Sequence, residues 1–343
     1  MKERSVLFTF DYELFLGARS GRARDCLIEP TGRLLELMGK FGFRGVFFVD
    51  TVYLIRLEEL AAGNEQAARD LADIRGQLEE IVGRGHAIFP HIHAHWIDAT
   101  YSSDRNEWTL ENMRYYQFAS LDKERQQHLF ERSMQIIGSV TDKIPGASKI
   151  DSYRAGGWSI QPFSQFKPYF LRYGITDEWS VIPGKYHLSD AHSFDFRGAP
   201  AQTPVYRFEE DPAIQDDKGS FREWTISTIC MTSFEKWVDF KISGLIRRLG
   251  KKEPAKGSTV GSTTIEEGDI YQRGRHRRMT ASFEGLNPFT LRKYLSAIRK
   301  APYFQFISHP KLLSSFELAM IERLFSALHK KYNLQTDFRK VTF

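Results

Sequence analysis

The stretch SVLFTFDYE, Ser5–Glu13, sets the pattern for the whole chain. Its β-branched and aromatic residues predict a buried strand over Ser5–Asp11. Because side chains alternate along an extended chain, Asp11 and Glu13 at the end of this strand face the same side. Two such carboxylates can share the work of a site, one holding a metal and the other acting as a base. A helix cap or a salt bridge is the structural alternative.

Outward from this stretch, the chain alternates between predicted strands and predicted helices. The other strands are predicted at Gly45–Asp50, His86–His91, Ser152–Arg154 and Tyr303–His309. Helices are predicted at Glu65–Gly83, Asp122–Val140 and Phe163–Tyr173, and after the capping signals at Asn287 and Ser314. Repeated strand–helix units indicate an α/β fold with a parallel sheet, either open or closed into a barrel.

In parallel α/β folds the chemistry lies at the C-terminal ends of the strands. Four candidate side chains stand at predicted strand ends, namely Asp11, His91, Arg154 and His309. The Arg154 guanidinium can hold a carboxylate in a bidentate pair, and the glycines that follow it allow close approach of the backbone. His309 is a candidate acid or base near neutral pH. Taken singly, Arg154 and His309 are each more typical of structural residues.

The strand end at His91 has the most candidate metal ligands. The segment His91-Ile92-His93-Ala94-His95 holds three of the ten histidines of the chain. Neutral imidazoles are the commonest ligands of zinc-like ions, and two or three of them with a carboxylate leave one position open for water. His91 and His95 face together if the chain turns helical here, whereas His91 and His93 face together if it stays extended. The alternative is a chance cluster of structural histidines.

The order and spacing of these segments resemble the five motifs of the polysaccharide deacetylase family, also called the NodB-homology group or carbohydrate esterase family 4. The motifs correspond, in order, to Thr9–Glu13, Gly85–His95, Arg154–Trp158, Asp177–Trp179 and Phe306–His309. The second is the most specific and the fourth is the weakest. The resemblance covers roughly residues 5–312, which is most of the chain.

The resemblance implies a distorted (β/α) barrel of about seven parallel strands. It also implies a single domain over residues 1–343 and one bound divalent metal ion, most commonly zinc. Asp11 would be the catalytic base, oriented by Arg154. His309 would be the general acid, tuned by an acidic residue at Asp177 or Glu178.

The implied metal ligands depart from the family pattern at one position. Tyr12 stands where the family has a ligand aspartate, and this moves the ligand role to Glu13. The resemblance carries the other ligand roles to His91 and His95. His93 is an additional histidine that could displace His95.

The implied reaction is hydrolysis of an N-acetyl group, or in second place an O-acetyl group, on a saccharide. Trp96, Trp158 and Trp179 are candidates to stack on sugar rings, with a place in the core as the alternative for each. The competing functions are a related amidase or deformylase acting on a non-carbohydrate amide, and a catalytically silent barrel that binds saccharide.

The composition limits the partners, cellular location and substrates that we expect. The 343 residues are 41% hydrophobic and 27% charged, as in globular proteins, which excludes wholesale disorder. The net charge of +5 is mild, so nucleic acid is not an expected partner. Two cysteines cannot form a disulfide framework, and the first residues lack the apolar stretch of a signal peptide. We therefore expect a cytoplasmic location and a nucleotide-linked or lipid-linked saccharide substrate. The motif variants resemble the branch found in surface-polysaccharide and O-antigen gene sets.

Two segments fall outside the barrel pattern. Residues 250–278 are polar and rich in Gly, Ser and Thr, which predicts a mobile surface insertion. Phe234–Leu249 before them predicts an amphipathic helix whose apolar stripe has basic residues around it. Such a helix normally packs its stripe against the barrel. The alternative is a peripheral contact with the anionic inner surface of the membrane.

Overall fold

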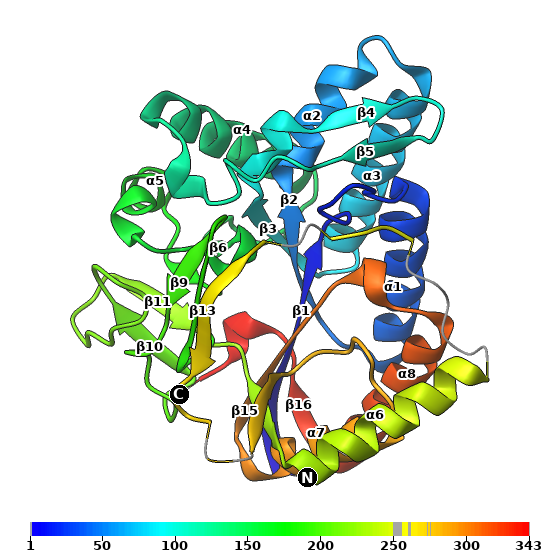
Figure 1. The fold of residues 1–343 in the computed structure, drawn as a ribbon, viewed down its shortest axis with the longest axis vertical. Coiled ribbons are helices and arrows are strands. Elements are labelled where there is room, and N and C mark those ends of the chain that lie inside the picture. The colour runs from blue at the N-terminus through cyan, green and yellow to red at the C-terminus, as the bar shows by residue number, and fades with distance from the viewer. Residues whose placement is uncertain (1, 250–255, 260–261, 273, 275, 343) are drawn as a thin grey trace.

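The centre of the fold is a curled β-sheet whose strands run almost entirely parallel (Figure 1). The computed structural model describes residues 2–249, 256–259, 262–272, 274 and 276–342. Within these residues the strands, in spatial order, are β10 (Val205–Phe208), β11 (Phe221–Trp224), β7 (Asp177–Glu178), β6 (Ser152–Ala155), β3 (Ala87–Ile92), β2 (Val46–Asp50), β1 (Lys2–Tyr12) and β15 (Tyr303–Ser308). A further strand, β16 (Tyr332–Gln335), pairs with the start of β1. Among the described strands of this sheet, only β10 and β11 pair antiparallel.

Irregular backbone links β15, at one end of the sheet, back toward β7. The Ile226 N–H donates to the Val181 carbonyl at 2.9 Å, beyond the end of β7. The Ala281 N–H donates to Ser227 at 2.8 Å, and the Ile307 N–H in β15 donates to Ala281 at 3.0 Å. These bonds link β15 back toward β7, so the sheet curls into a distorted barrel. The α/β class and the barrel architecture predicted from the sequence are confirmed.

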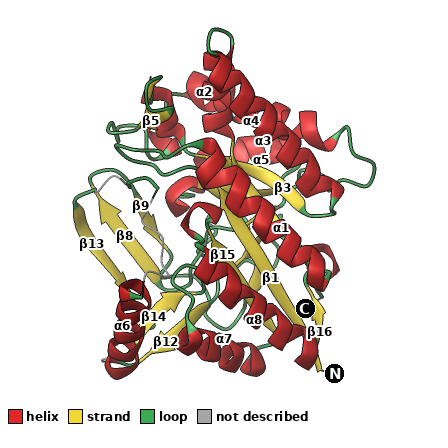
Figure 2. Ribbon diagram, turned by 90° about the vertical axis from the view of Figure 1, so that its right-hand side faces the viewer, coloured by secondary structure: helices red, strands yellow, loops and turns green. Residues whose placement is uncertain are grey.

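Helices lie outside the curled sheet (Figures 1 and 2). They are α1 (Glu29–Phe41), α2 (Thr51–Ala61), α3 (Glu65–Gly83), α4 (Lys123–Thr141), α5 (Lys167–Tyr173), α7 (Pro288–Lys300) and α8 (Ser315–Lys331). The capping boxes expected at Asn287 and Ser314 are present at the starts of α7 and α8. In the core between the sheet and these helices, Phe306 stacks on both Phe8 and Phe283. Every helix of the described residues is too short or too polar to span a bilayer.

Smaller elements lie outside the main sheet. They are the hairpin β4 (Thr100–Ser102) and β5 (Glu107–Thr109), the sheet of β8 (Lys185–Ser189), β9 (Ser193–Asp195) and β13 (Thr264–Asp269), the pair β12 (Thr228–Met231) and β14 (Arg277–Thr280), and helix α6 (Ser233–Arg248). Residues 250–255, 260, 261, 273 and 275 of the predicted insertion lie outside the described residues. Its described part forms β13 and β14, which pair through their backbones with β8 and β12.

Candidate active site

The end of β1 places two carboxylates on one side of the chain. Asp11 and Glu13 are both buried, and both approach the imidazoles of His91 and His309. Tyr12 between them points the opposite way, and its hydroxyl donates to the Gln77 side chain at 2.9 Å. Because Tyr12 belongs to the packing beneath α3, Glu13 is the carboxylate available beside Asp11.

Three potential ligand atoms converge beside β3. Glu13 Oε2 lies 2.6 Å from His93 Nε2 and 3.3 Å from His91 Nε2, and the two imidazole nitrogens are 3.0 Å apart. β3 ends at Ile92, but the backbone stays open at His93, with φ −101° and ψ 89°, before a 3-10 turn begins. Gly156 leaves room for this group, since a Cβ there would lie 2.4 Å from the Ile92 carbonyl and 2.9 Å from His93 Nδ1.

The donor set fits a divalent metal ion. His91 Nδ1 is 2.8 Å from the backbone carbonyl of Arg154, an acceptor that places the proton on Nδ1. His91 Nε2 then faces the Glu13 carboxylate at 3.3 Å, a contact that is favourable only with a cation between them, either a metal ion or a proton on Nε2. Two imidazoles and a carboxylate, all buried, are the donors that zinc takes in sites with an open position.

His95 lies apart from this group. Its ring stacks on Tyr116 with centroids 4.8 Å apart, and neither of its nitrogens has a hydrogen-bond partner among the described residues. Burial, followed by the charge of His93, places the pKa of His95 well below its usual range. The geometry therefore favours His93 over His95 as the second imidazole, the reverse of the order implied by the resemblance. The extended backbone is the reason, because it turns residues 91 and 93 to one side.

Arg154 fixes Asp11. The fully buried guanidinium donates to Asp11 Oδ1 at 2.6 Å and to Thr9 Oγ1 at 2.8 Å. Asp11 Oδ2 remains directed at the imidazoles, 3.6 Å from His309 Nε2 and 4.0 Å from His91 Nε2. Burial by itself raises the pKa of Asp11, but the charges of Arg154, His91 and His309 outweigh it and lower that pKa. Asp11 is therefore ionised at neutral pH and one of its oxygens is free to accept a proton.

His309 is held between carboxylates. Its Nδ1 is 2.6 Å from Glu284 Oε1, which also accepts the backbone N–H of His309 at 3.1 Å. Nε2 faces the site, 3.6 Å from Asp11 and 3.5 Å from Glu13. Burial lowers the pKa of His309, but Glu284 and then the two site carboxylates raise it to about 9. The imidazole is therefore protonated at neutral pH, with one N–H directed at the site.

Lys311 is an additional cation at the site that the sequence analysis did not single out. Its ammonium donates to Glu13 Oε1 at 2.8 Å and to the Leu14 carbonyl at 2.6 Å. Burial raises the pKa of Glu13, but Lys311 and His93 outweigh it and hold that pKa well below the usual range. Lys311 thus keeps Glu13 ionised and occupies Oε1, the oxygen that points away from His91 and His93.

These groups form the floor of a cavity of about 900 Å³. Its walls are made by side chains of β8, β9, β13, β14 and α6, of the loops between them, and of the segments that follow β5 and β6. Among them are Tyr116, Trp158, Lys185, Tyr186, His192, Phe194, Lys236 and Arg277. A cavity of this size and mixed polarity accommodates a small saccharide.

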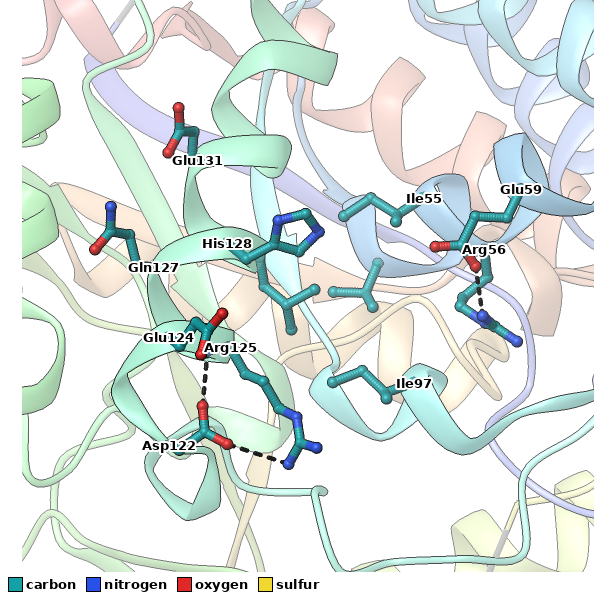
Figure 3. A pocket seen from close by; sticks show the side chains of 12 residues that line it. Ile55, Arg56, Glu59, Ile97, Asp122, Glu124, Arg125, Gln127, His128 and Glu131 are labelled. Atoms are coloured by element: carbon teal, nitrogen blue, oxygen red, sulfur yellow. Dashed lines mark hydrogen bonds and ion pairs between the residues drawn. The ribbon is translucent and has the colours of Figure 1, made fainter.

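A second cavity lies between α2 and α4 and is shown in Figure 3. It measures about 660 Å³ and is lined by aliphatic side chains such as Ile55 and Ile97 and by charged side chains such as Arg56 and Arg125. None of the candidate site residues lines it. The candidate chemistry therefore lies in the cavity at the end of the barrel.

Comparison with solved structures finds similar proteins. A structure from Mycobacterium smegmatis assigned to the polysaccharide deacetylases shares 14% identity, covers 97% of this chain and 86% of that one, and has a TM-score of 0.49. A family 4 carbohydrate esterase from Streptomyces lividans, in complex with acetate, shares 12% identity over 97% of this chain and 91% of that one, with a TM-score of 0.41. A 4-alpha-glucanotransferase from Thermococcus litoralis shares 12% over 100% of this chain and 41% of that one, with a TM-score of 0.48.

No protein-family model matches the chain, and no curated protein sequence matches it. The structural similarities include both deacetylases and a glucanotransferase. At identities of 12–14% these similarities do not determine the activity, which must be inferred from the side chains of the site.

Two of the three tryptophans proposed to stack on sugars are in the core. Trp96 is fully buried, and its Nε1 donates to Asp50 at 2.5 Å. Trp179 is fully buried and stacks on Trp224 with centroids 4.8 Å apart. The expectation of sugar stacking is wrong for both, because neither ring reaches the cavity. Trp158 is half-buried and lines the cavity.

Asp177 does not reach His309. Its carboxylate accepts from Arg222 at 2.8 and 2.9 Å and from Trp224 Nε1 at 2.6 Å, which makes it a structural ion pair. The neighbouring Glu178 bonds to Ser180, also away from His309. The acidic partner that the resemblance placed at these positions is instead supplied by Glu284. The sequence gives no local signal for Glu284, which lies 25 residues before its partner.

Proposed function

We propose that this chain is a metal-dependent deacetylase that hydrolyses an N-acetyl group on a saccharide. The observation that carries this proposal is the convergence of Glu13, His91 and His93 beside an ionised Asp11 and a protonated His309, on the floor of one cavity. A base and an acid beside a potential metal site are what hydrolysis of an unactivated amide requires.

The proposed metal ligands are Glu13, His91 and His93, and zinc is the ion whose preferred donors they are. When bound, a divalent ion supplies Lewis acidity that polarises the acyl oxygen and acidifies water. Residues around the ligands set their protonation states. The Arg154 carbonyl sets the tautomer of His91, and Lys311 keeps Glu13 ionised.

Asp11 and His309 move the protons. Asp11 Oδ2 takes a proton from the attacking water, while Arg154 holds Oδ1 and fixes the direction of the carboxylate. The water oxygen bonds to the acyl carbon, and the carbon–nitrogen bond breaks. His309 Nε2 donates its proton to the leaving nitrogen, so the products are acetate and an amine. Glu284 positions His309 through Nδ1 and maintains its charge.

The proposal extends to the substrate and its setting. We infer an N-acetylated, nucleotide-linked or lipid-linked intermediate of surface-polysaccharide synthesis, as in O-antigen gene sets, in a single-domain cytoplasmic protein with a peripheral contact to the inner membrane. An O-acetyl group is the second choice. Lys185, Lys236 and Arg277 on the cavity wall support an anionic linkage group, since they form no ion pair with a described carboxylate. Aromatic walls support a sugar.

A screen for acetate release tests this proposal. Zinc-loaded protein is incubated with N-acetylated nucleotide sugars and lipid-linked saccharides, and free acetate is measured. We expect release from at least one substrate, with a loss of on the order of 10²–10⁴ in rate for Asp11→Asn at unchanged zinc content. Zinc binding without acetate release from any of them would contradict the proposal and favour a non-carbohydrate amidase or a silent saccharide-binding barrel.

A further inference from the structure

Helix α6 presents an apolar face that no described part of the chain covers. The helix stands at the edge of the molecule, beside β12 and α7 (Figure 2). Its outer side carries large apolar side chains that are more than half exposed, namely Phe234 (70%), Trp237 (54%), Phe240 (69%) and Leu245 (58%), and Leu249 (60%) follows its end. Packing against the barrel, the usual role of such a stripe, therefore accounts for only part of it.

Both acidic residues of α6 lie on its inner side, where they contact α7 and its N-cap. Glu235 pairs with Lys293 of α7 at 2.7 Å. Asp239 Oδ1 accepts from the Asn287 amide at 2.7 Å, at the N-cap of α7. These are the two acidic residues of the helix, and both are engaged with the body of the protein. The apolar contact on this side comes from half-buried side chains, Val238, Ile242 and Ile246.

The outer side carries positive charge instead. The Lys241 ammonium lies 5.6 Å from the centre of the Trp237 ring, and Arg248 is exposed at the end of the helix. Neither pairs with a carboxylate of the described residues. Helix α6 thus separates its charges, with both acids inward and the two bases Lys241 and Arg248 outward among exposed aromatic and aliphatic groups. This is the pattern of helices that lie in the interface of an anionic bilayer.

We propose that the outer face of α6 docks this protein on an anionic lipid bilayer. Aromatic and leucine side chains would enter the headgroup boundary, and Lys241 and Arg248 would face the lipid phosphates. Lys236 of the same helix lines the candidate active-site cavity, together with Arg277 of the adjacent strand β14. Docking would therefore bring the rim of the cavity to the headgroups. Resting on the proposed function, this makes a lipid-linked saccharide the substrate class that the cavity receives.

Vesicle binding tests the surface without any substrate. The full chain is sedimented with phosphatidylglycerol-containing vesicles and with pure phosphatidylcholine vesicles. We expect binding to the first that falls steeply as salt approaches about 1 M, where the screening length is about 3 Å. The double variant Lys241→Gln/Arg248→Gln should bind about 30-fold more weakly, which corresponds to about 1 kcal/mol per basic residue. The matched control, Lys330→Gln/Lys331→Gln on α8, should bind like the parent.

The apolar part of the face has its own test. Trp237→Ser and Phe240→Ser should each weaken binding on the order of tenfold, whereas Leu171→Ser, a 63%-exposed leucine on α5, should not. The fluorescence of the parent should shift to the blue on vesicle binding, and the shift should shrink in Trp237→Phe while binding remains. Equal binding by the α6 variants and their controls would overturn the proposal. So would self-association of the parent that the α6 variants abolish, because a second copy would then cover the face.

The outcome is separable from that of the proposed function. Asp11→Asn should bind vesicles like the parent, and the α6 variants should hydrolyse a water-soluble N-acetylated saccharide at the parental rate. Vesicle binding without any deacetylation would keep the docking surface and reject only the lipid-linked substrate.

Discussion

Replacing Glu284 by glutamine should lower the pH at which deacetylation fails on the alkaline side. In the proposed reaction His309 acts in its protonated form, so its contribution is lost as the pH rises through its pKa. Burial lowers this pKa, whereas Glu284, 2.6 Å away, and then Glu13 and Asp11 raise it to about 9. Glutamine keeps the size and the hydrogen-bonding capacity of Glu284 and removes its charge.

The expected size of this shift follows from the contact. An opposite charge within about 4–6 Å moves a pKa by roughly 1–3 units. The Glu284 side chain is 30% exposed, and solvent screening places the effect at the lower end of that range. Losing the carboxylate should therefore move the alkaline limb down by about 1 unit, or about 1.4 kcal/mol.

The assay is kcat measured across the alkaline range for the parent, Glu284→Gln and a control. Glu267→Gln is the matched control, because Glu267 also lines the cavity but lies 3.5 Å from His187 and is 70% exposed. We expect the alkaline limb to move in Glu284→Gln alone. An unmoved limb in Glu284→Gln, or an equal shift in the control, would refute the assignment of His309 as the acid and Glu284 as the group that charges it.

Further variants test other parts of the account. His93→Ala should reduce zinc affinity in a competition titration by more than about 100-fold, beyond what outer-shell residues contribute, and His95→Ala should reduce it less; the reverse order would restore His95 as the ligand. Trp158→Ala should raise KM. Trp96→Ala should instead lower the free energy of unfolding by about 3–5 kcal/mol in denaturant titrations, and a variant as stable as the parent would contradict the place of Trp96 in the core. Burial, and then Glu178, raise the pKa of Glu223 well above its usual range, so the folded parent retains a proton that its unfolded chain loses as pH rises through the ordinary carboxyl pKa. Between pH values of about 5 and 8 the parent should therefore lose stability relative to Glu223→Gln, and parallel curves would show that Glu223 is ionised.

The sequence predicted those parts of the fold and site that local patterns determine. Apolar runs located the central strands, and the alternation along β1 placed Asp11 and Glu13 on one side. The order of the strand ends then brought His91, Arg154 and His309 to the same edge, because parallel strands end together.

The choice between His93 and His95 depended on a detail that residue types do not determine. An extended chain pairs His91 with His93, and a helical one pairs it with His95. The backbone stays open for one residue beyond β3 before the 3-10 turn begins, and that residue is His93. The spacing of the histidines is compatible with both outcomes.

The remaining differences come from long-range packing. Glu284 reaches His309 only because the segment between β14 and α7 folds over the end of β15. The resemblance implied Asp177 or Glu178 there, but Arg222 and Trp224 of β11 hold Asp177 in the sheet. Burial of a tryptophan is likewise set by what packs on it. For α6, helical spacing predicted an apolar stripe, but only the assembled structure separates the side that touches α7 from the side that faces outward.

The most direct test of the account is the location of zinc in crystals of the zinc-loaded protein, by anomalous scattering at the zinc edge. We predict one strong peak bounded by Glu13 Oε2, His91 Nε2 and His93 Nε2, with ligand distances of about 2.0–2.2 Å and Asp11 Oδ2 directed at the open position. A fully occupied peak elsewhere, or a structure in which Lys311 remains on Glu13 and the three donors bind no metal at saturating zinc, would contradict the central claim.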